Sequence, residues 1–376
     1  MLLLAPMIWK TPGGVQRYMQ TICRILREHG ENLSVVTLLD DGSDRPWDVE
    51  WKSVCCNGSK VKFCLRAFCC AQADASGVCI VGHVGPLPVA WILKRFKLID
   101  RYALVLHGIE AWERLSWLDR LALRNATVII ATTNYTAREF CFHNRISPTS
   151  VAVVPLTSTL PFREVQRQRT GGRLNVLTIS RLSHWDAYKG IDTLLTAVAK
   201  ARSAGVNLRL DVVGDGDDRN RLEAITTSLQ IRDLVSFHGS VADEEVQHLI
   251  AEAHIFAMPS KKEGFGIVFL EAMAAGLPCI GANHGGTPEV IEHGETGFLI
   301  EYGDSDALAF YLQTLAESPR LLERMSAAAQ NRNREVFSLE LMSARWKRLI
   351  QSLLIRRVPS VDDPIRVAGD LPSSAN

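Results

Sequence analysis

The sequence predicts an α/β protein made of two doubly wound, Rossmann-like domains that face each other across a cleft. Short apolar runs alternate with helical patterns, and this alternation favours parallel sheets with right-handed crossovers. The pattern is interrupted by a polar, arginine-rich joint over residues 157–173 and then restarts. A chain of 376 residues is also long enough for two domains that each bury a substantial core.

Apolar runs mark the expected strands of both domains. In the first domain they cover residues 2–8, 33–39, 78–82, 103–106, 128–131 and 151–154. In the second domain they cover residues 175–180, 207–213, 235–239, 255–259 and 278–281. The helical patterns between them supply the crossovers of a doubly wound sheet.

This pattern divides the chain into four segments. Residues 1–157 form the N-terminal domain and residues 158–338 the C-terminal domain. A helix over residues 339–357 is expected to cross back towards the first domain, with Trp346, Leu349, Ile350 and Leu353 on one face. Residues 358–376 are rich in proline and polar residues, and we expect this tail to be disordered.

Composition excludes several classes of protein. Hydrophobic residues make up 47% and charged residues 22% of the chain, as in an ordinary soluble domain, and a net charge of +1 argues against a nucleic-acid binder. Residues 1–8 are expected to be a first strand rather than a signal peptide, and no apolar window reaches the ~20 residues that span a bilayer. Nine cysteines, an odd number without paired zinc spacing, favour a reducing cytoplasm.

Charge is distributed unevenly along the chain. Residues 1–157 carry 18 Lys and Arg against 13 Asp and Glu, whereas the remainder carries 24 against 28. The densest basic cluster contains Lys94, Arg95, Lys97 and Arg101. Such a cluster suits the anionic inner face of a membrane, and a solvated helix face is the alternative. The protein is therefore expected to be cytoplasmic and either soluble or peripheral to a membrane.

Polar or glycine-rich residues follow six of the expected strands. In doubly wound sheets, ligands bind beyond the carboxyl ends of the strands. These positions are Gly13-Gly14, His83, His107-Gly108, Arg181, Gly214-Asp215-Gly216 and the turn at Glu263. Their concentration at strand ends predicts a binding site there.

Two glutamates flank a glycine turn that opens a helix in the second domain. The helix begins near Ile267, and its first N–H groups and positive dipole end suit a phosphate. Glu271 lies inside the helix, ~7–8 Å from that anion site at ~1.5 Å per residue, within reach of a ribose. Glu263 lies before the helix, on the other side of the phosphates. The alternative is that Glu263 interacts with the helix dipole and Glu271 is solvated.

The motifs of the second half resemble family 4 of the retaining glycosyltransferases, which have the GT-B fold. The resemblance extends from Gly13-Gly14 to about Phe310, and its specific part is the second half. The matching residues are Ser180-Arg181-Leu182, Lys189-Gly190, Val213-Gly214-Asp215-Gly216, the segment 237–241, Glu263 with Glu271, and Gly285-Gly286-Thr287-Pro288-Glu289.

The resemblance implies a role for each matched residue. Arg181 and Lys189 would bind the diphosphate of a nucleotide-sugar donor, and Glu271 would hold its ribose. Glu263 would contact the donor near the reacting carbon, and His107 would face the donor sugar. The diphosphate would also be bound at Gly13, Gly14 and the backbone N–H groups of Gly266, Ile267 and Val268. The base would be bound by residues 239–241, ending in Val241.

The resemblance also implies the chemistry. Fixed positive charge at the diphosphate stabilises the leaving group as the glycosidic bond breaks. Configuration is retained, a phosphate oxygen takes the acceptor's proton, and neither a metal nor a cofactor is required. Asp215 and Asp217 form the Asp-x-Asp pattern of a metal-dependent glycosyltransferase, and the family's Gly-Asp-Gly turn is the interpretation that we favour for them.

Three functions are compatible with these residues. The first is a retaining glycosyltransferase acting on a glycan or lipid-linked acceptor in cell-surface polysaccharide or glycolipid synthesis. The second is a nucleotide-sugar epimerase of the same fold, and the third is a non-catalytic subunit that binds a nucleotide-sugar. The donor base, sugar and acceptor are not readable, and residues 40–52 and 58–71 are expected to be the loops that select the acceptor.

Overall fold

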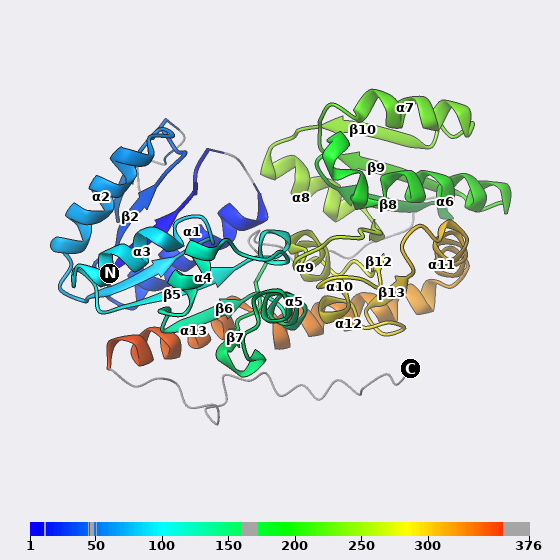
Figure 1. Cartoon of the computed structure of the whole chain (residues 1–376). Helices are drawn as coiled ribbons and strands as arrows, with labels where there is room; N and C mark the ends of the chain where they lie inside the picture. The colour runs from blue at the N-terminus through cyan, green and yellow to red at the C-terminus, as the bar shows by residue number, and fades with distance from the viewer. Residues whose placement is uncertain (11–12, 44, 46–48, 50, 159–171, 356–376) are drawn as a thin grey trace. The chain divides into compact units, whose positions relative to one another are not determined.

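The computed structural model describes residues 1–10, 13–43, 45, 49, 51–158 and 172–355 (Figure 1). The chain divides into two compact units. The first unit contains Met1–Leu156 and the helix that continues from Glu340, and the second unit contains Thr157–Leu339. The tail expected to be disordered, residues 358–376, lies outside the described residues.

The first unit is built on a parallel sheet of seven strands in the order β3-β2-β1-β4-β5-β6-β7. Leu2 on β1 pairs with Ser34 of β2 on one side and Cys79 of β4 on the other. The central strands are buried on both faces, as expected for a parallel sheet covered by helices. The strands are β1 (Leu2–Ala5), β2 (Ser34–Thr37), β3 (Lys52–Cys55), β4 (Val78–Val81), β5 (Arg101–Leu106), β6 (Val128–Ala131) and β7 (Val151–Val153).

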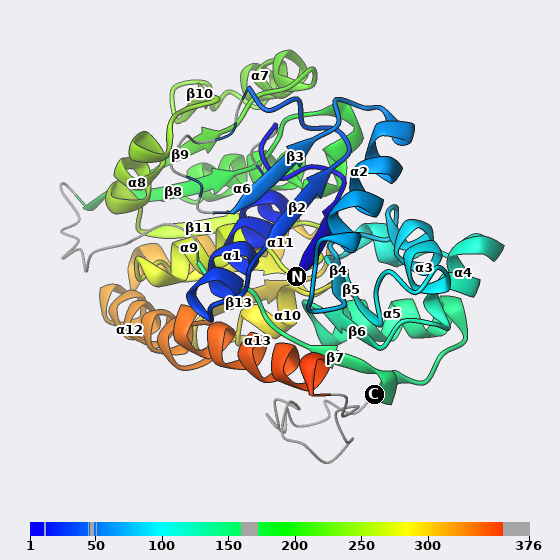
Figure 2. The same cartoon turned by 90° about the vertical axis from the view of Figure 1, so that its left-hand side faces the viewer.

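Helices cover both faces of this sheet. One face is covered by α2 (Lys60–Gln72), α3 (Leu87–Arg95), α4 (Trp117–Leu123) and α5 (Asn134–Asn144), and the other by α1 (Gly14–Glu28) and α13 (Leu339–Leu354) (Figure 2). Short 3-10 turns lie at η1 (Ile109–Ala111) and η2 (Pro148–Ser150). The face of α13 predicted to be apolar is buried, and Arg101 Nη1 donates a hydrogen bond of 2.6 Å to the carbonyl oxygen of Leu353.

The second unit repeats the architecture with six parallel strands in the order β10-β9-β8-β11-β12-β13. They are β8 (Leu174–Ile179), β9 (Leu208–Val213), β10 (Val235–Gly239), β11 (Ile255–Met258), β12 (Cys279–Ala282) and β13 (Gly297–Ile300). Its helices are η4 (His184–Lys189), α6 (Ile191–Ser203), α7 (Arg219–Ser228), α8 (Asp243–Glu252), α9 (Ile267–Ala274), α10 (Thr287–Val290), α11 (Ser305–Glu317) and α12 (Pro319–Val336). Residues of α6, α11 and the strands form one buried apolar core.

The predicted α/β fold is confirmed, and every expected strand is present with its ends shifted by a few residues. Two strands were missed. β3 is an edge strand whose residues are all at least partly exposed, so no apolar run marks it. β13 begins with Gly297, which is atypical of a strand. The interpretation of residues 58–71 as a loop was wrong, because most of them form α2, whose exposed apolar side chains hide the helical pattern.

No helix in the described part of the chain is long and apolar enough to cross a bilayer.

Candidate active site

The turn between β11 and α9 strongly favours glycine at position 266. Gly266 has φ of +89°, and a Cβ there would lie 2.5 Å from Cδ2 of Phe269 and 3.2 Å from Cγ of Glu263. Glycine adopts this left-handed conformation without strain. The helix α9 then begins at Ile267. The first N–H groups of a helix have no intrahelical partner, so those of Ile267 and Val268 are suited to an anion.

The backbone of Glu263 is held by a second glycine turn. The N–H of Gly286 donates to the carbonyl oxygen of Glu263 over 2.7 Å. Gly285 has φ of +65°, and a Cβ there would lie 2.5 Å from the same oxygen. The Gly285-Gly286 pair thereby fixes the turn from which the Glu263 side chain projects.

The side chain of Glu263 forms an ion pair with Lys189. Lys189 Nζ lies 2.6 Å from Glu263 Oε2, and the two side chains are only 18% and 14% exposed. The structure therefore brings together two of the four residues predicted to be catalytic. The pair places the Lys189 ammonium group beside the turn that leads into α9.

Backbone contacts between the two loops explain how Lys189 reaches Glu263. The N–H of Lys261 donates to the carbonyl oxygen of Tyr188 over 2.8 Å. Gly190 ends η4 with φ of +78°, and a Cβ there would lie 2.3 Å from the carbonyl oxygen of Pro259. The loop after β8 therefore packs directly on the turn after β11.

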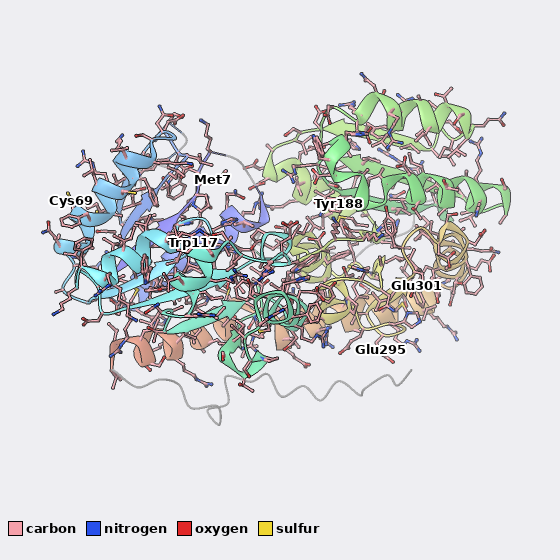
Figure 3. All side chains as sticks on the ribbon, viewed as in Figure 1. Met7, Cys69, Trp117, Tyr188, Glu295 and Glu301 are labelled. Atoms are coloured by element: carbon pink, nitrogen blue, oxygen red, sulfur yellow. The ribbon has the colours of Figure 1, made fainter. Side chains whose placement is uncertain are left out.

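Arg181 is linked to this pair through Asp186 and Tyr188, of which Figure 3 labels Tyr188. Its Nε lies 3.2 Å from Asp186 Oδ2, and the hydroxyl of Tyr188 donates to Asp186 Oδ1 over 2.8 Å. Lys189 Nζ lies 5.6 Å from the centre of the Tyr188 ring. Burial, reinforced by the Asp186 carboxylate, raises the pKa of Tyr188, so its hydroxyl remains a donor. The Arg181 side chain is 72% exposed and accessible to a ligand.

Glu271 lies inside α9 and is 5% exposed. The alternative in which Glu271 is solvated is therefore wrong, and so is the one in which Glu263 interacts only with the helix dipole. The position of Glu271 inside α9 is compatible with the role expected of it. Its contact with a ribose stays a prediction.

The ends of β8, β9 and β10 approach one another through glycines. The N–H of Gly214 donates to the carbonyl oxygen of Gly239 over 2.8 Å, and a Cβ on Gly214 would lie 1.8 Å from the carbonyl oxygen of Ser180. Val241, predicted to contact the base, follows β10 and is half-buried. Val241 and Arg181 therefore both lie beyond the carboxyl ends of strands in the second sheet.

Both aspartates of the Asp-x-Asp pattern make contacts within the protein. Asp217 Oδ1 accepts a hydrogen bond of 2.8 Å from the N–H of His184, and Asp215 Oδ2 lies 3.8 Å from Arg219 Nη1. Over the described ranges, no group of three or more His, Cys, Asp or Glu side chains is placed to hold a metal ion.

In the first unit, His107 follows β5 and is 7% exposed. Its Nε2 donates to the carbonyl oxygen of Gly82 over 2.7 Å, and its Nδ1 is buried without a hydrogen-bond partner among the residues described. The ring meets that of Tyr18 edge to face, with centres 5.6 Å apart. Gly13 caps α1, the helix that carries Tyr18, and Gly14 is its first residue. The strand ends and α1 therefore meet at His107.

Glu110 is a further polar residue at this place that the sequence did not reveal. Its Oε1 accepts hydrogen bonds from the N–H groups of His107 at 2.6 Å and Gly108 at 3.1 Å. His83, after β4, accepts a hydrogen bond of 3.1 Å at Nδ1 from the N–H of Gly85. Burial lowers the pKa of His83, and the Glu110 carboxylate opposes that shift. The signal that could have identified Glu110 in the sequence is its position three residues after His107, at one 3-10 turn.

Two family models match the chain, one in each half. The model described as Glycosyltransferase Family 4 matches residues 12–156, and the model described as Glycosyl transferases group 1 matches residues 163–332. Together they include every site residue predicted from the sequence.

Curated relatives are also glycosyltransferases by name. A GDP-mannose-dependent alpha-(1-6)-phosphatidylinositol monomannoside mannosyltransferase of Mycobacterium tuberculosis is 35% identical over 189 residues, which are 48% of this chain and 46% of the relative. An MMP alpha-(1->4)-mannosyltransferase of Mycolicibacterium hassiacum is 27% identical over 66% of this chain and 59% of the relative. The chain thus spans about half the length of the curated relatives it matches.

Solved structures show the same fold. HepE of Anabaena, in complex with UDP and glucose, superposes with a TM-score of 0.75 at 20% identity, over 93% of this chain and 99% of that chain. Sucrose-phosphate synthase of Thermosynechococcus elongatus superposes with a TM-score of 0.77 at 21% identity, over 94% and 99%. With two parallel sheets of this topology and glycosyltransferase models matched in both halves, the chain belongs to the group 1, family 4 glycosyltransferases and has the GT-B fold.

Proposed function

We propose that this chain is a retaining, metal-independent glycosyltransferase that moves a sugar from a nucleotide-diphosphate sugar to a glycan or lipid-linked acceptor. The observation that carries the proposal is the ion pair of 2.6 Å between Lys189 and Glu263, which lies in the turn that opens α9. A cation beside the start of a helix, where unpaired N–H groups gather, suits a diphosphate.

In this proposal the second unit binds the donor. Lys189 and Arg181 supply positive charge to the diphosphate, together with the N–H groups of Gly266, Ile267 and Val268. Glu271 accepts hydrogen bonds from the ribose hydroxyls, and Val241 lies against the base. Because Arg181 is exposed while its partner Asp186 is buried, the guanidinium is positioned by the protein and still accessible to phosphate oxygens.

The reaction breaks the bond between the anomeric carbon and the diphosphate oxygen, and negative charge grows on that oxygen. Lys189 and Arg181 stabilise this charge in the transition state more than in the ground state, which lowers the barrier. The acceptor hydroxyl attacks from the face that the diphosphate leaves, so configuration is retained, and a phosphate oxygen takes the hydroxyl proton. Glu263 keeps Lys189 in place and lies near the reacting carbon.

The first unit is proposed to bind the acceptor. Gly13, Gly14 and His107 lie beyond the carboxyl ends of β1 and β5, and in this proposal the two glycines admit the donor diphosphate while His107 faces the donor sugar.

The relatives suggest the classes of donor and acceptor. The mycobacterial relative is named as GDP-mannose-dependent and acts on a phosphatidylinositol mannoside, and HepE was solved with UDP-glucose. Two further relatives are named as glycosyltransferases of colanic acid and amylovoran biosynthesis. We therefore place the reaction in polysaccharide or glycolipid synthesis, in the cytoplasm, where the nine unpaired cysteines would remain reduced.

Both matched family models are glycosyltransferase models, and nothing in them favours the epimerase.

The test of the proposed function is release of nucleoside diphosphate from a panel of UDP-, GDP- and ADP-sugars, with and without candidate acceptors. We expect acceptor-dependent release that Lys189→Ala and Glu271→Ala abolish while the fold remains intact. Conversion of the donor to an epimer, or turnover unchanged in both variants, would refute the proposal. Binding without turnover would identify a non-catalytic subunit.

A further inference from the structure

We propose that the indole of Trp185 stacks on the nucleobase of the donor. The inference rests on the proposed function, in which Val241 is the side chain placed against the base, and adds an aromatic side chain to that site. Trp185 belongs to η4, the 3-10 helix that follows Arg181 and ends at Lys189. All of these residues lie in the second unit.

The proposed contacts of the donor define a path along the carboxyl edge of the second sheet. The diphosphate is expected at Lys189 and the start of α9, beyond β11, and the base at residues 239–241, beyond β10. In the strand order β10-β9-β8-β11, the ends of β9 and β8 lie between these two places (Figure 1). Neighbouring strands lie ~4.8 Å apart. A nucleotide that joins the two places therefore passes the ends of β8 and β9.

The helix η4 extends along the same edge of the sheet. At one end, the N–H of His184 donates to Asp217 Oδ1, in the loop after β9, over 2.8 Å. At the other end, the N–H of Lys261, in the turn after β11, donates to the carbonyl oxygen of Tyr188 over 2.8 Å. The helix therefore crosses the end of β8 beside the path of the nucleotide, and Trp185 lies near its β9 end.

Trp185 shares one side of η4 with a residue of the candidate site. Side chains three residues apart eclipse each other in a 3-10 helix, so Trp185 and Tyr188 project from the same side. Lys189 Nζ lies 5.6 Å from the centre of the Tyr188 ring. The side of η4 that carries Tyr188 thus meets the cation expected to bind the diphosphate. Trp185 projects on that side, from the end of η4 that is nearer to the base.

The indole of Trp185 is available to a ligand. Trp185 is 86% exposed, whereas the next residue, Asp186, is 7% exposed and pairs with Arg181. A base that stacks on the indole removes apolar surface of both rings from water. Base–aromatic stacking is tolerant of the base, because every base has a π-face. The contact therefore strengthens nucleotide binding without selecting one base.

The place of Trp185 on η4 favours the base over either sugar. The transferred sugar is bonded to the diphosphate, and the acceptor hydroxyl must reach the carbon that carries it. Both are therefore expected beside Lys189, which lies four residues, or ~8 Å at ~2.0 Å per residue, from Trp185 along η4. The base is the part of the donor farthest from the reacting bond, and residues 239–241 follow the strand next to β9.

Calorimetric titration of the full chain with UDP, GDP and ADP tests the proposal, and inorganic pyrophosphate is the probe that lacks a base. We expect Trp185→Ala to weaken binding of nucleoside diphosphate at least about fivefold, the lower end of what base–aromatic stacking contributes. Binding of pyrophosphate should not change. Trp185→Phe keeps an aromatic face and should restore most of the affinity.

Trp117→Ala is the matched control. Trp117 is the first residue of α4, in the first unit, and is 72% exposed. This variant should bind nucleotides as the wild type does. If Trp185→Ala also binds them as the wild type does, or loses affinity for pyrophosphate by the same factor as for nucleotides, the inference is wrong.

The outcomes separate this inference from the proposed function. A wild-type chain that binds no nucleoside diphosphate would contradict both. A wild-type chain that binds nucleotide and transfers sugar, while Trp185→Ala keeps its nucleotide affinity, would contradict the inference alone. If Trp185→Ala raises only the KM for the acceptor, the indole contacts the acceptor and the stacking contact is refuted.

Discussion

Lys189 Nζ lies 2.6 Å from Glu263 Oε2, in an ion pair that joins two loops 74 residues apart in the sequence. Both side chains are more than four-fifths shielded from solvent. A carboxylate that holds a lysine side chain in one position leaves its ammonium group pre-organised for a second anion. This arrangement is the kind that electrostatic catalysis requires, since the charge needs no reorientation during the reaction.

Removing one partner of this pair should destabilise the second unit. We expect Lys189→Met to lower the free energy of unfolding by about 1–3 kcal/mol, because a largely buried Glu263 carboxylate would lose its charged hydrogen-bond donor. Urea unfolding measures this loss. The double variant with Glu263→Gln should cost less than the sum of the two single variants. Lys200→Met is the control, since its ion pair with Asp306 has the same length but is exposed, and its loss should cost below about 1 kcal/mol.

Asp186 should act as a positioning residue for Arg181. Asp186→Asn keeps the shape of the side chain but weakens its contacts with the guanidinium and the Tyr188 hydroxyl. We expect KM for the donor to rise about tenfold, equivalent to ~1.4 kcal/mol, with a smaller change in kcat. Steady-state kinetics over a donor titration measure both constants. Asp233→Asn, which removes an exposed partner of Arg202, should leave KM unchanged. Equal effects of the two variants would contradict this role.

Gly190 should be intolerant of any side chain. Gly190→Ala adds a Cβ at 2.3 Å from the Pro259 carbonyl oxygen in a residue with φ of +78°. We expect a marked fall in Tm, because the strain of the left-handed conformation and the clash both contribute. Gly205→Ala separates the two effects, since Gly205 has φ of +83° with nothing within 4 Å of the added Cβ. It should cost only about 1–2 kcal/mol. Similar losses in Tm would contradict the packing of the two loops.

The first unit should lose stability in mild acid through His83. Burial lowers the pKa of His83 in the folded state below its ordinary value of 6.5. The unfolded chain therefore binds more protons just below pH 6.5, and the contribution to stability present above that pH is lost as the pH falls through the folded pKa. His83→Gln should flatten the dependence of Tm on pH between roughly 7 and 5. His248→Gln, on an exposed helix face, should leave it unchanged.

The sequence predicted the fold well where burial leaves a regular signal. Strands such as β4 and β11 are buried on both faces and stand out as aliphatic runs. The edge strand β3 carries no such signal, since all of its residues are at least partly exposed. The amphipathic pattern of α2 was obscured because Val61 and Leu65 are apolar on its solvent side.

The candidate site was predicted in part. Lys189 and Glu263 were identified through motifs and proved to be in contact. Asp186 and Tyr188 were not assigned a role in the sequence. Their contacts depend on which way the side chains of one loop point relative to Arg181, and residue spacing does not predict that direction. Glu110 was missed for a related reason. Its carboxylate accepts hydrogen bonds from backbone N–H groups. Other carboxylate or amide side chains can accept such bonds as well, so the residue type at this position does not reveal them in the sequence.

Thermal denaturation of the full chain with a panel of UDP-, GDP- and ADP-sugars tests the central claim most directly. A ligand that binds only the native state stabilises it, by ~2.7 kcal/mol at one hundred times Kd. We predict that at least one nucleotide-sugar raises Tm of the wild-type chain, and that Lys189→Ala and Glu271→Ala abolish this rise. If no nucleotide-sugar raises Tm, or if the rise is the same in both variants, the second unit does not bind a donor through these residues.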